Sequence, residues 1–125
     1  MKTYFVSGHR YITNAEFQEH YIPKLYRALY RGPCEFVVGD YQGVDSLAQR
    51  YLKGAKAAVT VYHMFTNPRN NIGDHPTKGG YKNDIARDSA MTKESDEDIA
   101  WVRKGQETSG TAQNVDRRKK YNERL

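Results

Sequence analysis

The sequence predicts a single α/β domain in which a short parallel sheet is covered by helices on both faces. Short runs of β-branched and aromatic residues alternate along the chain with stretches of helical periodicity. Most connections between them are short, and this alternation implies parallel strands joined by right-handed crossovers. A chain of 125 residues fits one domain, residues 1–125, and leaves no room for two.

The expected strands are short and mostly apolar. They cover residues 3–6, 35–38, 57–62 and 98–102. The third is nearly continuous in apolar and β-branched residues, which is typical of a strand covered on both faces. We expect the sheet order 3-2-1-4, a Rossmann-like three-layer arrangement. In that order the loops after the first and fourth strands lie side by side at the point where strand order reverses.

Each strand is followed by a stretch of helical pattern. Thr13 and Glu16 form a capping box at the start of the first helix. Pro23 lies within this helix and should kink it, because proline removes a backbone donor. Later helices are expected at about residues 44–53, at 81–92 and from 111 onward. The apolar stripe of the first helix consists of Phe17, Tyr21, Leu25 and Leu29.

One connection is unusually long. Residues 66–80 are polar and rich in Gly and Pro, with no hydrophobic period. Loops of this length in a compact domain are usually functional or disordered. Since this loop leaves the end of the third strand, we expect it at the edge of the sheet where ligands bind.

The positive charge is concentrated near the C-terminus. The formal net charge is +5, and residues 103–125 carry 7 Lys and Arg against 3 Asp and Glu. The basic run at residues 117–120 could contact nucleic acid. A solvated helix face is the favoured interpretation, because no aromatic side chains for base stacking are interleaved with the run. We therefore do not expect nucleic acid as a partner.

The composition favours a cytoplasmic protein without a membrane segment. Cys34 is the only cysteine, so an internal disulfide is impossible. No apolar run approaches the roughly 18 residues that a membrane span needs. The first residues begin a strand-like pattern and contain no apolar signal region.

Glycine-rich loops mark the expected binding edge. The strand-to-helix connections at residues 7–10, 39–45, 66–80 and 108–112 all meet at the carboxyl ends of the strands. Three of them pair Gly with Ser, Thr or Asp directly before a helix. Glycine allows close backbone approach, and the free N–H groups of the following helix can bind an anion. The sequence therefore predicts a site for a phosphate or a carboxylate.

These segments together resemble the SLOG superfamily. The similarity rests on Ser-Gly-His-Arg at 7–10, Gly-Asp-Tyr-Gln-Gly-Val-Asp-Ser-Leu-Ala at 39–48, Arg87 with Met91 and the Ser-Asp pair at 95–96, and Ser-Gly-Thr-Ala-Gln-Asn-Val at 109–115. It extends over residues 3–119. Related groups are the cytokinin-activating phosphoribohydrolases (the lysine decarboxylase-like group), a small bacterial and phage branch of unknown activity and, more distantly, the nucleoside deoxyribosyltransferases.

The resemblance implies a nucleotide-binding site. Ser7, Gly8 and Arg10 would border the ligand, and residues 43–45 would shape the second loop. Residues 110 and 111 would cradle a phosphate. His9 could donate a proton to a phosphate or to a leaving base. The candidate ligand-binding residues are Ser7, Gly8, His9, Arg10, Gly39, Gly43, Arg87, Ser109, Gly110, Thr111 and Asn114.

The resemblance also raises the question of catalysis. The related enzymes cleave or transfer an N-glycosidic bond, and their phosphoribohydrolase motif Gly-Thr-x-x-Glu supplies an active-site Glu. Asn114 occupies that position here, and an amide cannot act as nucleophile or general base. Asp40 and Asp45 are the candidate replacements, although Asp40 could equally cap the second helix. Asp84 and Asp88 lie four residues apart and are interpreted as a solvent-facing pair.

Three functions remain open from the sequence. The first is a sensor or sequestering protein that binds a nucleotide or a nucleotide-derived small molecule. The second is an N-glycosidic hydrolase or a deoxyribosyltransferase, and the third, weaker, is nucleic-acid binding through the basic C-terminal helix. No metal or other cofactor is expected, because His63, Asp74 and His75 match no standard metal spacing. The tyrosine-rich first helix favours a homodimer or a higher homo-oligomer.

Overall fold

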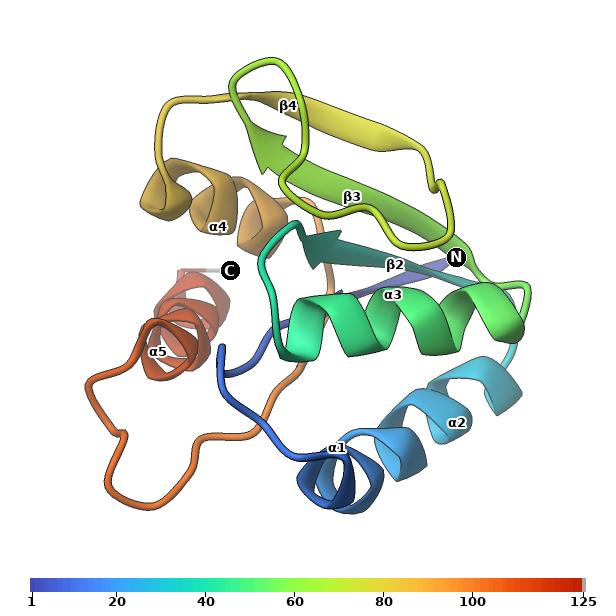
Figure 1. Ribbon diagram of the computed structural model, residues 1–125. Coiled ribbons are helices and arrows are strands. Elements are labelled where there is room, and N and C mark those ends of the chain that lie inside the picture. Colours follow the sequence, from blue (N-terminus) through green and yellow to red (C-terminus); the bar gives the residue numbers. More distant parts are fainter. Residues whose placement is uncertain (125) are drawn as a thin grey trace.

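The computed structural model describes residues 1–124 and shows an all-parallel sheet in the order β4-β3-β2-β1-β5 (Figure 1). The expected α/β fold, a parallel sheet flanked by helices, is confirmed. The expected order 3-2-1-4 is present as β3-β2-β1-β5, and β4 extends it by one strand at the edge. The strands are β1 (Lys2–Val6), β2 (Cys34–Gly39), β3 (Ala58–Met64), β4 (Thr77–Tyr81) and β5 (Glu97–Ile99).

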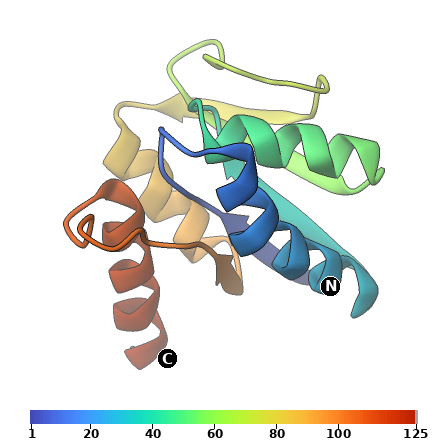
Figure 2. The ribbon, with the colours of Figure 1, turned by 60° about the horizontal axis from the view of Figure 1, so that its bottom comes forward.

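Helices cover both faces of the sheet (Figures 1 and 2). Three of them pack on one face through the larger apolar core, and two lie on the opposite face. The first layer contains α1 (Asn14–His20), α2 (Ile22–Tyr30) and α3 (Val44–Gly54). The second contains α4 (Asp84–Lys93) and α5 (Gly110–Glu123).

The alternation of side chains along β1 shows how the two layers are divided. Tyr4 and Val6 are buried in the core beneath α1, α2 and α3, whereas Phe5 is buried with Met91 of α4. Side chains of a strand point alternately to the two faces of a sheet, so one five-residue strand contributes to both cores. This strand is central in the sheet and pairs with β2 and β5.

The first expected helix is divided in two. Tyr21 ends α1 and is also the residue before α2, so Pro23 lies in the first turn of α2. Proline is tolerated there, because the first N–H groups of a helix have no partner within the helix. The expected kink is therefore a break between two helices. The capping box of Thr13 and Glu16 is present as predicted.

The long loop expected at residues 66–80 is partly a strand. Its last residues form β4, which pairs in parallel with β3 and has mostly exposed side chains. Gly79 lets β4 cross over His63, since a Cβ there would lie 2.1 Å from the imidazole Cε1. The strand was missed because its Thr-Lys-Gly-Gly-Tyr sequence has no apolar alternation. The fourth expected strand is also shorter than predicted, ending at Ile99.

No helix within residues 1–124 is long and apolar enough to cross a membrane.

A buried tyrosine joins the ends of two adjacent strands, β1 and β5. The hydroxyl of Tyr21 donates to the carbonyl of Ser7, at 2.7 Å, and accepts from the backbone N–H of Trp101, at 3.0 Å. Ser7 follows β1 and Trp101 follows β5, so this one hydroxyl ties together the two loops where strand order reverses. Burial raises the pKa of Tyr21 well above its usual value, which keeps the hydroxyl protonated.

We expect Tyr21→Phe to lower the free energy of unfolding by about 1–3 kcal/mol. The substitution keeps the ring in the core but leaves a buried carbonyl and a partly buried N–H without a partner. Urea denaturation monitored by circular dichroism measures the change. Tyr11→Phe is the matched control, because Tyr11 is 72% exposed. Equal stability of the two variants would contradict the linking role of Tyr21.

Candidate functional site

An open cavity of about 520 Å³ lies at the carboxyl ends of the central strands. The loop after β1 and the long connection from β5 to α5 border it, and the latter is the orange segment of Figure 2. Two predicted residues, Asp40 and Gly43, lie outside its lining. The predicted residues that line it are Ser7, Gly8, His9, Arg10, Gly39, Asp45, Arg87, Ser109, Gly110, Thr111 and Asn114.

Two glycines allow the first loop to pack against the start of α3. A Cβ at Gly8 would lie 2.3 Å from Val44 Cγ2 and 2.4 Å from the Tyr21 hydroxyl. Gly43 has a positive φ of 79°, and a Cβ there would lie 2.2 Å from the carbonyl oxygen of Arg10. Gly43 therefore lies beneath the first loop and supports it, which explains why it does not line the cavity.

The start of α5 offers unpaired backbone donors to the cavity. Ser109 caps the helix, and its hydroxyl accepts from the N–H of Ala112 at 3.2 Å. The N–H groups of Gly110 and Thr111 form no hydrogen bond with any part of the described chain. The helix dipole places partial positive charge at this end. Together these features favour an anion beside Gly110 and Thr111.

Ser7 adds a side-chain hydroxyl next to that helix end. Its backbone is fully engaged, because the N–H donates to Ile99 and the carbonyl accepts from Tyr21. Its Oγ is buried and has no hydrogen-bond partner among residues 1–124. An unpaired buried hydroxyl is costly in a folded protein. The Ser7 hydroxyl is therefore free to bind an oxygen atom of a ligand in the cavity.

Asn114 presents a donor rather than an acceptor to the cavity. Arg117 Nη1 donates a hydrogen bond to the Asn114 side-chain oxygen. A guanidinium can only donate, so the orientation of the Asn114 amide is fixed by its partner. The amide nitrogen is thus left for the cavity, which Asn114 lines while only 4% exposed. This arrangement binds an acceptor atom and cannot remove a proton.

Carboxyl groups from α3 and α4 also line the cavity. Asp45 is buried, and its Oδ2 accepts from the N–H of Tyr41 at 3.1 Å. Burial raises the pKa of Asp45 to about 7. Asp84 and Asp88 also line the cavity and both pair with Arg87. Asp88 is mostly buried, which differs from the solvent-facing pair expected from the sequence, whereas Asp84 is half exposed.

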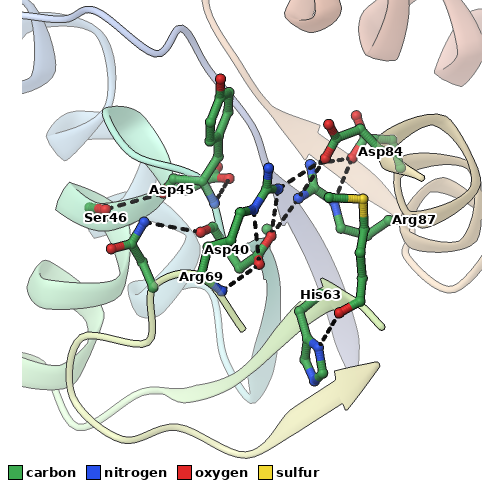
Figure 3. Close-up of polar contacts among 12 residues, drawn as sticks. Asp40, Asp45, Ser46, His63, Arg69, Asp84 and Arg87 are labelled. Atoms are coloured by element: carbon green, nitrogen blue, oxygen red, sulfur yellow. Dashed lines mark hydrogen bonds and ion pairs between the residues drawn. The ribbon is translucent and has the colours of Figure 1, made fainter. Parts of the chain in front are cut away.

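Asp40 is held between two arginines outside the cavity lining (Figure 3). Its carboxylate accepts from Arg69 Nη2 at 2.8 Å and from Arg87 Nη1 at 2.7 Å, and it is 1% exposed. Burial alone would raise the pKa of Asp40, but the hydrogen bonds from Arg69 and the charges of both arginines outweigh it and lower the pKa. Asp40 neither faces the cavity nor caps α3, whose first turn follows Gly43. The Asp40 carboxylate therefore holds the Arg87 side chain in place.

His9 is held neutral by a contact that the sequence did not reveal. The Nε2 atom of His9 accepts from the backbone N–H of Arg103 at 2.9 Å, so the proton of the imidazole is on Nδ1. Burial, together with the charge of Arg103, lowers the pKa of His9. His9 can donate only through Nδ1, and not through the nitrogen that Arg103 occupies.

Arg103 also fastens the long connection before α5 to the start of α1. Its guanidinium donates to both carboxylate oxygens of Glu16, at 2.9 and 3.1 Å. It also lies over the ring of Trp101, 5.3 Å from the centroid. Arg103 lines the cavity, and sequence reasoning missed it because its partner Glu16 is 87 residues away. The capping box at Glu16 was the only local signal.

Arg10 stands at the rim with aromatic neighbours. Its guanidinium lies over the rings of Tyr11 and Tyr41, with centroid distances of 5.2 and 5.4 Å. Arg69 covers Tyr41 as well, at 4.7 Å. The Tyr41 ring therefore contacts two cations. The electron-rich face of an aromatic ring attracts cations. This packing positions Arg10 beside the cavity.

The crossover connection between β3 and β4 supports the site from outside. None of residues 66–80, all of which the structure describes, lines the cavity, but the loop lies at this edge of the sheet as expected, because Arg69 and Asn70 contact Asp40 at the end of β2. Gln49 also holds the segment: its side chain accepts from the N–H of Ile72 and donates to the carbonyl of Asn70. His75 is used in the same way, since its Nε2 contacts the Gln49 carbonyl at 3.1 Å. Within the described part of the chain, no three His, Cys, Asp or Glu side chains are grouped to hold a metal ion.

The chain was compared with protein-family models, with curated proteins and with solved structures, and nothing matched in any of the three comparisons. The loop after β1 and the start of α5 offer hydrogen-bond donors to the cavity, and α3 and α4 offer carboxyl groups.

The raised pKa of Asp45 predicts a specific dependence of stability on pH. The folded protein keeps the Asp45 proton up to about pH 7, whereas the unfolded chain loses it near the ordinary aspartate pKa of 3.8. Between these values the folded state binds more protons, so this group stabilises the fold at low pH and its contribution falls as pH rises.

We expect Asp45→Asn to remove this dependence. The free energy of unfolding of the wild type, minus that of the variant, should fall by a few kcal/mol as pH rises from about 4 to about 7. Urea titrations of both proteins across this range measure the difference, and subtraction removes the contribution of every other titrating group. A difference that stays constant, or that rises with pH, would contradict a raised pKa at Asp45.

Proposed function

We propose that the protein binds a nucleotide or a nucleotide-derived small molecule in the cavity at the carboxyl ends of the strands. The observation that carries the proposal is that one cavity is lined both by the start of α5 and Ser7, whose hydroxyl is unpaired, and by carboxyl groups. A cavity of about 520 Å³ is within the usual size for small-molecule sites. The phosphate would lie beside Gly110 and Thr111, and hydroxyl groups of the sugar would face Asp45 and Asp88.

The ligand must carry both an anionic and a hydroxyl-bearing part. A phosphate alone would not use the carboxyl groups that line the cavity, and a neutral sugar would not use the start of α5. A nucleoside phosphate satisfies both sets of groups at once. The resemblance of residues 43–48 and 109–115 to the SLOG superfamily agrees with this ligand class.

Binding without turnover is the favoured role, as in a sensor or a protein that sequesters its ligand. Asn114 offers an amide where the related phosphoribohydrolases have Glu, and Arg117 holds that amide as a donor. Asp40, one of the two candidate replacements, is neutralised by Arg69 and Arg87. At position 114 the family's catalytic group is therefore absent, and at position 40 the carboxylate is already paired with two arginines.

One observation favours a second function, cleavage or transfer at an N-glycosidic bond. Asp45 is buried beside the cavity with a pKa raised to about 7, and a carboxyl group with such a pKa can give or accept a proton near neutral pH. A hydrolase or deoxyribosyltransferase of this chain would therefore use Asp45. The same group binds ligand hydroxyls in the favoured proposal, so activity must be measured directly.

Nucleic-acid binding through the basic C-terminal helix is less well supported. Arg118, in the middle of the run at residues 117–120, is buried and pairs with Asp98 at 3.1 Å. It also donates to the Ser95 carbonyl, so it joins α5 to the end of α4 and to β5. A side chain committed to this pairing is not available to a phosphate backbone.

The oligomeric state and the cytoplasmic location stay predictions. Tyr26 and Tyr30 are exposed on α2, with ring centroids 4.6 Å apart, and such a pair suits a partly wet interface between two copies of the chain. We expect sedimentation analysis to show a dimer or a higher oligomer, and a monomer at micromolar concentration would contradict this.

Ser7→Ala tests the proposed site without disturbing the fold. We expect at least one compound in a panel of nucleoside mono- and diphosphates to bind the wild type in calorimetry. Ser7→Ala should weaken that binding by about 10- to 150-fold, because it removes one hydrogen bond to a charged group. Its stability should not fall, since the hydroxyl has no partner in the described structure. Thr66→Ala, which removes an exposed hydroxyl away from the cavity, is the control.

A second measurement separates a binder from an enzyme. We expect little or no free base when the protein is incubated with ribo- and deoxyribonucleoside monophosphates and analysed by chromatography. If base is released, Asp45→Asn should reduce the rate by about 10²–10⁴-fold, the usual range for losing a general acid or base. Turnover that survives Asp45→Asn would show that the chemistry uses another group. Absence of binding across the panel would contradict the proposal as a whole.

A further inference from the structure

A second groove lies between α4 and α5, apart from the cavity at the strand ends. Its volume is about 440 Å³, and no residue lines both. Cationic side chains dominate its lining, since Lys93, Arg117, Lys120 and Arg124 face a single acidic residue, Asp116. Lys93 belongs to α4, and the other three belong to α5 or follow it directly. The positive charge is therefore placed on both sides of the groove.

No ion pair among residues 1–124 neutralises this charge. Lys93, Lys120 and Arg124 form no ion pair with any of residues 1–124. Arg117 donates to Asn114, which is a neutral side chain. Cations grouped without counter-charges repel one another, and an anion between them relieves that repulsion.

The groove also contains a buried hydroxyl without a partner. Thr92 lines it and is 1% exposed, and its Oγ1 has no hydrogen-bond partner in the part of the chain that the structure describes. Ser89, three residues earlier on the same helix face, lines the groove as well. Burial of a hydroxyl without a partner is unfavourable. A bound acceptor oxygen would satisfy it.

We propose that this groove binds a small, multiply charged phosphate anion, with its oxygens on Thr92 and between the cations of α4 and α5. A small anion fits better than a nucleic-acid backbone, because the unpaired hydroxyl is buried between two helices and Arg118, the neighbouring cation, is turned into the fold. The site is separate from the proposed nucleotide cavity and does not depend on it.

Sodium tripolyphosphate is a suitable probe, followed by two-dimensional NMR of the full-length, isotope-labelled protein. We expect saturable shifts at Thr92, Lys93 and residues 117–120. Lys120→Ala/Arg124→Ala should weaken this binding by about two- to thirty-fold, because the variant loses two ion pairs of about 0.2–1 kcal/mol each. Arg50→Ala/Lys56→Ala removes the same net charge from exposed positions at α3, outside the groove, and should bind as the wild type does.

Thr92→Val tests the hydroxyl separately. The substitution is nearly isosteric and removes an unpaired group, so the variant should fold with unchanged or higher stability and bind tripolyphosphate several-fold more weakly. Ser7→Ala should leave the shifts in the groove unchanged, which distinguishes this site from the nucleotide cavity. Equal losses of tripolyphosphate affinity in both double variants, or NMR shifts confined to residues 7–10 and 109–114, would overturn the proposal. If a single-stranded oligothymidylate bound to the same residues more tightly than tripolyphosphate does, the groove would be assigned to nucleic acid instead.

Discussion

The buried carboxylate of Asp40 joins three parts of the chain that are distant in sequence. It lies at the end of β2, accepts from Arg69 of the crossover connection and accepts from Arg87 of α4. Removing one partner would leave a charge unpaired in the protein interior, which is strongly destabilising. The pairing therefore fixes Arg87 in place (Figure 3). Arg87 in turn pairs with Asp84 and Asp88, which line the cavity. The carboxyl wall of the site depends on this ion pair.

The loop after β1 and the connection before α5, which also border the cavity, are held by hydrogen bonds and by one ion pair. Tyr21 holds the ends of β1 and β5 together, and Arg103 fastens the connection before α5 to His9 and Glu16. These contacts use the backbone of Ser7 and leave its hydroxyl free. The protein thus satisfies the polar groups that support the site while leaving unpaired the donors that line it. Such a pattern is typical of a binding site formed before its ligand arrives.

Arg117 lies between the two sites considered above. Its guanidinium holds the oxygen of Asn114 at the cavity, and the same side chain lines the groove between α4 and α5. The replacement of the related enzymes' Glu by Asn is therefore part of a local arrangement on α5. An amide accepts this hydrogen bond without adding a charge beside a phosphate, which suits a wall that binds anions.

Local patterns in the sequence determined much of the fold. The apolar runs of β1, β2 and β3 and the capping box at Thr13 and Glu16 are visible because a strand and a helix start are set by residues within a few positions of one another. The glycine-rich loops also predicted the position of the cavity, because they too are recognised from residues that are close together in sequence. The exact break at Tyr21 was not predicted, although Pro23 signalled an irregularity.

Only the tertiary structure decided which polar residues line the cavity and which support the fold. Asp40 and Asp45 both seemed available from sequence, yet Asp40 meets Arg69, 29 residues away, whereas Asp45 stays beside the cavity. Arg118 looked like part of a basic surface, and its pairing with Asp98 turns it inward. β4 forms because β3 offers it backbone hydrogen bonds along an open edge, not because its own sequence favours a strand. Each of these outcomes depends on a partner distant in sequence, and a local pattern carries no information about such a partner.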